Sequence, residues 1–191
     1  NNWDLAFATY NRGAAGSAIL INESYTSLWA HPGDTADWST FDSTGFNKWD
    51  RYLNSDTSWT NGALNTKRGT KGMFDMGWGV LHPSNNYWTF GHSLYLVKLS
   101  NNTFKKLWIV SLKTGVWEFK YANLDGSNEK VITIKKSDYK DRNFVYHSML
   151  NDSTLDREPD NTAWDLTFMK HVDFINPPGM YVNASSIFNN R

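Results

Sequence analysis

The sequence predicts an all-β protein of antiparallel strands, on the basis of three observations. Aromatic residues make up 16 % of the 191 residues, ten of them Trp, and aromatic and β-branched side chains are enriched in strands. Three apolar runs, Ser93–Leu99, Phe104–Leu112 and Val116–Ala122, are separated only by short polar turns. Turn signals recur too often for long helices. We therefore expect these runs to form three consecutive antiparallel strands.

Shorter apolar runs predict further strands before and after this meander. Residues 22–62 are rich in Trp, Asp, Ser and Thr and have weak periodicity, and residues 151–162 form an acidic, polar loop. One predicted strand is rich in glycine, which indicates either a bulge or a place where something approaches the backbone closely. This glycine-rich run is Gly72–Leu81, and the other predicted strands are Trp3–Phe7, Ala18–Ile21, Lys130–Lys135 and Trp164–Phe168.

The composition excludes several classes of protein. Nineteen basic residues balance nineteen acidic ones, so the net charge gives no support to a nucleic-acid partner. The chain has no cysteine, and no apolar run reaches the roughly 18 residues that a transmembrane helix needs. The sequence contains no nucleophile elbow, zinc-protease motif or phosphate loop. We therefore expect a protein that is not an enzyme and has no transmembrane segment in this chain.

Two segments of the chain resemble each other. Asn2–Phe7 (NWDLAF) is echoed by Ala163–Phe168 (AWDLTF), and each copy is followed by a polar turn and a segment of small residues. We interpret this similarity as an internal repeat, and the alternative is two edge strands of similar composition.

At these segments the chain resembles the HmuY-type haem-binding lipoproteins of Gram-negative anaerobes. In that family a Trp-Asp strand leads into a glycine-rich turn, as Trp3-Asp4-Leu5 leads into Asn11–Ser17 here. The last third of the family's module is a meander like the one predicted above. A Gly-Trp segment before that meander runs into a ligand histidine, and Gly77–His82 resembles it.

The family's opening segment appears late in this chain. Its order is a KTVTI-like strand, an aromatic stretch, a loop and the Trp-Asp strand, which matches Lys130–Ile134, Tyr139–Tyr146, residues 151–162 and Trp164–Phe168. Residues 1–126 therefore resemble a module that lacks its opening strand, and residues 127–191 resemble the opening of a second module, packed on the first. We expect Lys130–Ile134 to pair with the sheet of residues 1–126, or with that of a neighbouring copy by exchange, because proteins cover an open sheet edge.

The resemblance implies a fold of antiparallel sheets that form a hand-like cleft around a haem. It implies a haemophore-like lipoprotein of the cell surface or outer membrane, or a secreted protein, of a Gram-negative bacterium. Such a protein serves iron acquisition: it captures haem and passes it to a TonB-dependent outer-membrane receptor. The alternative function is a surface lipoprotein without haem, which either binds glycans or assists a receptor. The glycan alternative rests on Trp29, Trp38, Trp49 and Trp59, because aromatic faces stack on sugar rings.

The resemblance also implies the haem-binding residues. His82 matches the ligand histidine, and the second axial ligand is His31 or Met76, since imidazole and thioether both suit haem iron. Trp78 and Tyr87 would cover the apolar faces of the porphyrin. For His82 the competing interpretation is a loop histidine before Pro83, and for Met76 it is core packing.

Overall fold

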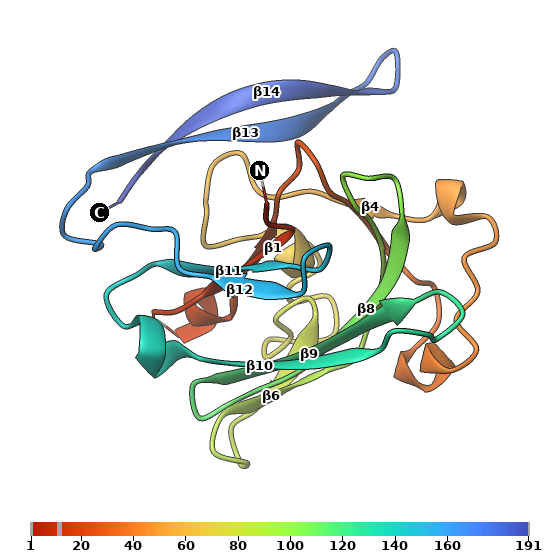
Figure 1. Ribbon diagram of the computed structural model, residues 1–191, viewed down its shortest axis with the longest axis horizontal. Coiled ribbons are helices and arrows are strands. Elements are labelled where there is room, and N and C mark those ends of the chain that lie inside the picture. The colour runs from red at the N-terminus through yellow and green to blue at the C-terminus, as the bar shows by residue number, and fades with distance from the viewer. Residues whose placement is uncertain (1, 11–12, 191) are drawn as a thin grey trace.

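The computed structural model describes residues 2–10 and 13–190, and they form antiparallel β-sheets arranged in layers. Figure 1 shows a large sheet at one side, a smaller sheet across the middle and a long hairpin, β13–β14, on the far side of the smaller sheet. This architecture confirms the predicted all-β class, whereas the HmuY-like cleft stays a prediction. None of the helices in the described ranges has the length and apolar character needed to cross a membrane.

The large sheet is built on the predicted meander. β7, β8 and β9 are neighbours, and β10 adds to β9 over the whole of Lys130–Lys135, as expected for that segment. β3 and β4 extend the sheet beyond β7, and the β5–β6 hairpin attaches to β8. The strands are β3 (Ser27–Ala30), β4 (Arg51–Tyr52), β5 (Gly79–His82), β6 (Trp88–Gly91), β7 (Leu94–Lys98), β8 (Phe104–Lys113), β9 (Val116–Asn123) and β10 (Lys130–Lys135).

The glycine-rich segment before the meander combines a strand with close backbone approaches. Gly77 has φ +93°, and a Cβ at this position would lie 2.7 Å from the carbonyl oxygen of Leu64. A Cβ at Gly79 would lie 2.4 Å from the oxygen of Phe90 on the paired strand. Glycine is required here because any side chain would collide with backbone.

The smaller sheet has the order β12-β11-β1-β2. Its strands are β1 (Leu5–Ala8), β2 (Ile19–Ile21), β11 (Phe144–Ser148) and β12 (Ser153–Leu155). One face of β1 packs on the large sheet, where Phe7 stacks on Phe119 at 4.6 Å between ring centroids and lies 5.3 Å from Trp117. The indole N–H of Trp117 donates to the oxygen of Ala8 at 3.0 Å. The main core therefore lies between the two sheets.

Residues 31–50 cover the outer face of the large sheet with short 3-10 helices rather than strands. Their aromatic side chains pack with Leu94 and Leu96 of β7 in a second apolar cluster. The ammonium of the buried Lys106 donates to the oxygen of Trp38 at 2.6 Å and lies over its ring. The 3-10 helices of the chain are η1 (Gly13–Ser17), η2 (Thr35–Trp38), η3 (Phe46–Lys48), η4 (Ala63–Asn65) and η5 (Lys136–Tyr139).

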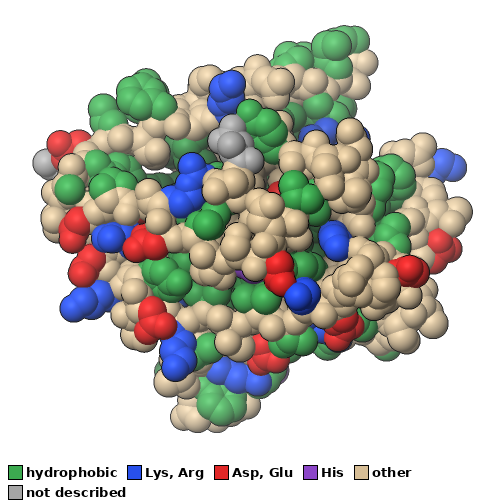
Figure 2. Space-filling model, viewed as in Figure 1, with side chains coloured by type: hydrophobic (Ala, Val, Ile, Leu, Met, Phe, Trp, Pro, Cys, Tyr) green, Lys and Arg blue, Asp and Glu red, His purple; other side chains and the backbone are tan. Residues whose placement is uncertain are grey.

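The hairpin of β13 (Leu166–Ile175) and β14 (Met180–Asn189) forms a separate two-stranded sheet. The buried carboxylate of Glu23 accepts the backbone N–H of Val172 at 2.7 Å. The guanidinium of Arg51 lies 4.2 Å from the ring centroid of Tyr181. These contacts fix the hairpin to the body, and its apolar side chains form part of the surface at the top of Figure 2.

Candidate ligand-binding site

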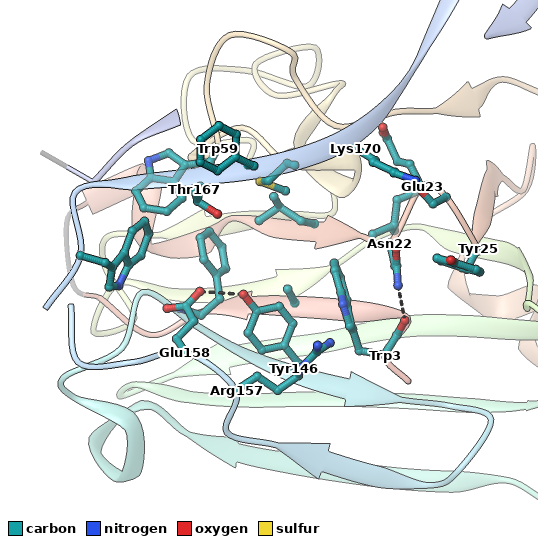
Figure 3. Close-up of a pocket in the computed structure, with 18 of the residues that line it drawn as sticks. Trp3, Asn22, Glu23, Tyr25, Trp59, Tyr146, Arg157, Glu158, Thr167 and Lys170 are labelled. Carbon is teal, nitrogen blue, oxygen red and sulfur yellow. Dashed lines mark hydrogen bonds between the residues drawn. The ribbon is translucent and has the colours of Figure 1, made fainter. Parts of the chain in front are cut away.

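A cavity of about 520 Å³ lies between β13 and the smaller sheet. Its walls come from both sheets and the loops between them: Trp3 and Ala6, residues 20–25, Trp59, Phe144 and Tyr146 of β11, residues 157–159, and Trp164 with residues 166–170. In Figure 3, Tyr146 and Glu158 lie on the side of the smaller sheet, and Thr167 and Trp59 lie on the side of the hairpin. This volume is typical of small-molecule sites, which span roughly 300–1,000 Å³.

Aromatic side chains form much of the cavity wall. Trp3 and Tyr146 meet edge to face with ring centroids 4.9 Å apart. Trp59 lies 5.8 Å from Phe144 and 5.5 Å from Trp164. Both tryptophans of the repeated Trp-Asp pair, Trp3 and Trp164, therefore line the same cavity.

A half-buried carboxylate fixes the polar side of the wall. The Tyr146 hydroxyl donates to Glu158 Oε1 at 2.7 Å, and the backbone N–H groups of Asn143 and Phe144 donate to Oε2 at 2.7 and 3.0 Å. Burial raises the pKa of Glu158 above its ordinary value, although these donors act in the opposite direction. The Arg157 guanidinium lies 5.7 Å from the Tyr146 ring centroid, so it adds a cation at the rim.

The opposite end of the cavity is fixed by the residues after β2. Asn22 donates its side-chain N–H to the oxygen of Trp3 at 3.0 Å. Besides Val172, the carboxylate of Glu23 also accepts the backbone N–H of Asn54. Burial raises the pKa of Glu23 above its ordinary value. These bonds hold the wall in place before any ligand arrives.

Two cations at the cavity are available to a ligand. The indole N–H of Trp164 has no hydrogen-bond partner among the described residues, but its nitrogen is buried and does not face the open cavity. Lys170 and Arg157 are exposed cations in the lining. The cavity therefore offers aromatic faces beside donors and cations, a combination suited to a ligand with both apolar and polar surfaces.

The predicted haem residues lie elsewhere, and none of the five lines this cavity. Trp78 and Met76 are buried in the main core, and the Trp78 indole donates to the oxygen of Ser17 at 3.0 Å. His82 is exposed at the end of β5, and Tyr87, 70 % exposed, lies in the turn before β6. In this conformation Trp78 and Met76 are part of the protein interior.

The two predicted iron ligands are also far apart. His31 donates its backbone N–H to Leu94, which pairs with Trp108 of β8. His82 lies in the β5–β6 hairpin, which joins the same edge of β8 near Leu112. The offset along β8 is roughly 15 Å at 3.3 Å per residue, whereas two nitrogens about 2 Å from one metal ion lie about 4 Å apart. The two histidines do not form an axial pair here, and haem binding stays a prediction.

The environment of His31 is that of a packed side chain. Its Nδ1 accepts the N–H of Gly33 at 3.0 Å, and its ring lies 4.6 Å from Phe41 and 5.2 Å from Trp49. Burial lowers the pKa of His31. Of the four tryptophans first considered for glycan stacking, Trp29, Trp38 and Trp49 belong to this outer cluster, and Trp59 lines the cavity.

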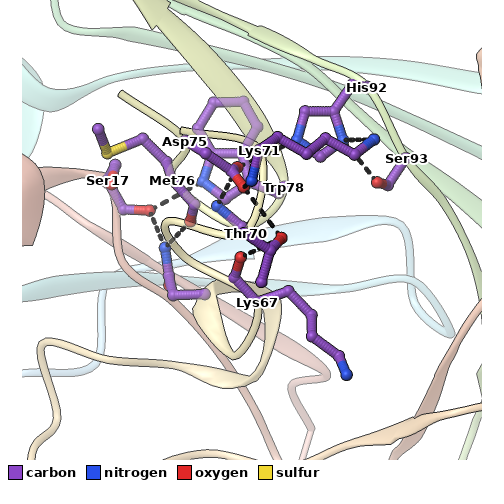
Figure 4. Close-up of polar contacts among 11 residues, drawn as sticks. Ser17, Lys67, Thr70, Lys71, Asp75, Met76, Trp78, His92 and Ser93 are labelled. Atoms are coloured by element: carbon purple, nitrogen blue, oxygen red, sulfur yellow. Dashed lines mark hydrogen bonds and ion pairs between the residues drawn. The ribbon is translucent and has the colours of Figure 1, made fainter. Parts of the chain in front are cut away.

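An Asp–His–Ser chain lies beside the glycine-rich segment (Figure 4). His92 Nε2 is 3.1 Å from Asp75 Oδ1, and His92 Nδ1 is 2.7 Å from Ser93 Oγ. The buried Asp75 carboxylate also accepts the backbone N–H groups of Gly77 and Lys71, at 2.8 and 2.9 Å. Burial pushes the pKa of Asp75 up, but these donors and His92 outweigh it and hold the pKa below its usual value. The network anchors the loop after η4 to the start of β7.

Comparisons of the chain with protein-family models, with curated proteins and with solved structures find no match. Within residues 2–10 and 13–190, no group of three or more His, Cys, Asp or Glu side chains is placed to hold a metal ion. The site is therefore defined by its geometry. Its wall joins residues far apart in the chain. Of the residues singled out in the sequence, the two tryptophans of the repeat, Trp3 and Trp164, and the glycan-stacking candidate Trp59 lie in it, although the sequence predicted no site at the repeat.

Proposed function

We propose that the protein is a glycan-binding module and that the cavity between β13 and the smaller sheet takes a sugar ring. The observation that carries this proposal is the wall of aromatic side chains beside fixed polar groups. The C–H face of a sugar packs on indole and phenol rings, while its hydroxyl groups need donors and acceptors at the edges. Trp3, Trp59 and Tyr146 supply ring surface, and the exposed cations Arg157 and Lys170 supply donors.

The pre-formed wall also supports this proposal. Ordering side chains on binding costs roughly 0.5–1.5 kcal/mol for each flexible group. Here Tyr146 is held by Glu158, and Trp3 is held at its backbone by Asn22 and at its ring by Tyr146. A ligand would therefore meet aromatic surfaces that are already oriented.

Titration with a panel of oligosaccharides, followed by tryptophan fluorescence and calorimetry, tests the proposal. Trp59→Ala and Arg157→Ala should each weaken binding about tenfold or more, because aromatic and arginine anchors dominate recognition. Trp88→Ala is the matched control: Trp88 lies on β6 outside the cavity, with its indole bonded to Thr114. Failure of every glycan to bind, or equal affinities in all three variants, would overturn the proposal.

A haemin titration of the same variants separates this function from haem capture, the function implied by the family resemblance. A sharp Soret band that is altered in His82→Ala and unchanged in Trp59→Ala would support the predicted axial ligand. Absence of any spectral change with haemin would count against haem capture and leave the two alternatives without haem, glycan binding and assistance to a receptor.

A further inference from the structure

The β13–β14 hairpin repeats the β1–β2 hairpin in structure as well as in sequence. When the two Trp-Asp pairs are aligned, the strand partners also align, residue for residue. The three matching pairs are Leu5↔Ile21 with Leu166↔Asn189, Ala6↔Leu20 with Thr167↔Phe188, and Phe7↔Ile19 with Phe168↔Ile187.

An asparagine at the equivalent position follows the second strand of each hairpin. In the first, Asn22 donates its backbone N–H to the oxygen of Asp4 at 3.0 Å and its side-chain N–H to the oxygen of Trp3 at 3.0 Å. In the second, Asn190 makes the same two bonds, at 2.8 and 2.7 Å, to the Asp and Trp of its own Trp-Asp pair. Antiparallel pairing alone would align the strand partners in this way, but two strands of merely similar composition would not also share an asparagine at the same offset with the same two bonds.

The equivalent faces of the two hairpins turn toward each other. Ala6 and Ala8 of the β1–β2 hairpin belong to an apolar cluster with Phe144. Met169 of β13 packs against this cluster, and so does Trp59. Met169 is the repeat equivalent of Ala8. The contact between the hairpins thus uses the same side of each.

The remaining faces differ completely in exposure. Leu5, Phe7 and Ile19 of the first hairpin are fully buried against the large sheet. Their equivalents in the second are 55 %, 76 % and 62 % exposed (Leu166, Phe168 and Ile187). Figure 2 shows apolar side chains along this hairpin at the surface of the molecule.

We propose that β13–β14 is the first hairpin of a second module, and that its Leu166–Phe168–Ile187 face is a docking surface for an antiparallel β-sheet. The partner sheet presents an apolar, aromatic-rich face, as β8 and β9 present to β1–β2. The first hairpin shows what such a face packs against: Phe7 lies on Phe119 and Trp117 of β9. A two-stranded hairpin is only marginally stable alone, so this surface gains from a covering layer.

A second copy using the same face is a poorer occupant. A ten-residue hairpin offers a face of roughly 33 by 10 Å, so two such faces bury about 650 Å² in total, which is well below the about 1,200 Å² of a stable interface. A broad sheet, by contrast, can cover the hairpin face and also reach the neighbouring loops.

To test the proposal, a sheet of known sequence is fused to the same chain, directly after the β13–β14 hairpin. The chain through Asn190 is joined to a second copy of residues 23–155, which carries β3–β12. Because Asn190 is equivalent to Asn22, residue 23 follows it at the same point as in the first module. The chain has no cysteine, so Phe168→Cys introduces a single thiol. The rate at which this thiol is modified measures how far the hairpin face is buried by another layer. Met73→Cys, at a site 84 % exposed and far from the hairpin in sequence, is the matched control.

We expect the appended sheet to fold, and the thiol at position 168 to react at least tenfold more slowly than in the unextended chain, since modification then requires local opening. The thiol at position 73 should react equally in both proteins. An unfolded appended sheet, or unchanged modification at position 168, would overturn the proposal. Protection at 168 in the unextended chain that rises with protein concentration would identify a second copy as the occupant and refute the stated partner.

Discussion

The hairpins β1–β2 and β13–β14 share a sequence pattern, a register and a pair of asparagine bonds, yet one is core and the other is surface. The difference lies in their neighbours. β1 is paired on both edges, by β2 and β11, and its apolar face meets the large sheet. Within the described residues, β13 is paired only by β14. Local sequence therefore determines the hairpin, and tertiary context determines what it contributes to stability.

The largest expected contrast is between Phe7→Ala and Phe168→Ala. Phe7 is fully buried, so its truncation should lower the free energy of unfolding by about 3–5 kcal/mol. Phe168 is 76 % exposed, so the same change there should stay within about 0.5 kcal/mol. Urea unfolding of both variants measures the difference. Similar losses would show that the second hairpin is already covered in solution.

Strand β11, which pairs with β1, carries the buried His147. The next expected effect is the pH dependence of the free energy of unfolding that this residue causes. Burial lowers the pKa of His147 from 6.5 to about 4. Between pH 6.5 and about 4, the unfolded chain therefore binds a proton at His147 that the folded chain does not bind. The free energy of unfolding consequently falls as the pH decreases from about 6.5 to 4. The shift corresponds to at most about 3–4 kcal/mol.

His147→Gln tests this dependence, because glutamine stays neutral throughout that range. The variant should lose much of the wild-type decline in unfolding free energy between pH 6.5 and 4. His82→Gln, on the exposed β5–β6 hairpin, controls for the change of residue type. An equally steep decline in His147→Gln would assign the effect to other groups.

The aspartates of the two Trp-Asp pairs should differ next. Asp4 is buried, and its carboxylate accepts the backbone N–H of Met149 at 2.7 Å and the hydroxyl of Thr26 at 3.1 Å. Asp4→Asn turns an amide N–H toward these donors and should cost about 1–3 kcal/mol. Asp165 is exposed, so Asp165→Asn should change stability by less than about 0.5 kcal/mol. Equal effects in thermal unfolding would contradict the proposed division between core and surface copies.

Much of the fold could be predicted because its strands carry local signals. The meander and Lys130–Lys135 are apolar runs bounded by turns, and they pair as the sequence predicts. The positions of Trp29, Trp38 and Trp49 could not be predicted. They pack on the outer face of a sheet, and residues 31–50, which carry two of them, form short 3-10 helices without periodicity. Only tertiary contacts decide such positions.

The cavity could not be predicted from the sequence for a related reason. Trp3, Trp59, Tyr146 and Trp164 converge from four separated segments, and nothing in their spacing brings them together. The family resemblance instead predicts a site at Gly77–His82. There the glycines serve backbone packing around Gly77 and Gly79, and Trp78 is interior.

The smallest contrast concerns the bonds that the two hairpins share. Asn22→Ala and Asn190→Ala each remove a side-chain donor from the carbonyl of the tryptophan in the Trp-Asp pair, and this shared bond contributes about 1 kcal/mol. In β1–β2 the loss should appear in global unfolding, because that hairpin opens only with the core. Asn190 also bonds Asn143 and the oxygen of Asn161, both at 2.6 Å, so it helps fix the second hairpin to the body. Its removal should speed amide hydrogen exchange across β13–β14 and leave exchange in β7–β9 unchanged, because an exposed hairpin can open locally. Faster exchange throughout the molecule in Asn190→Ala would show that the second hairpin is part of the same cooperative unit as the first.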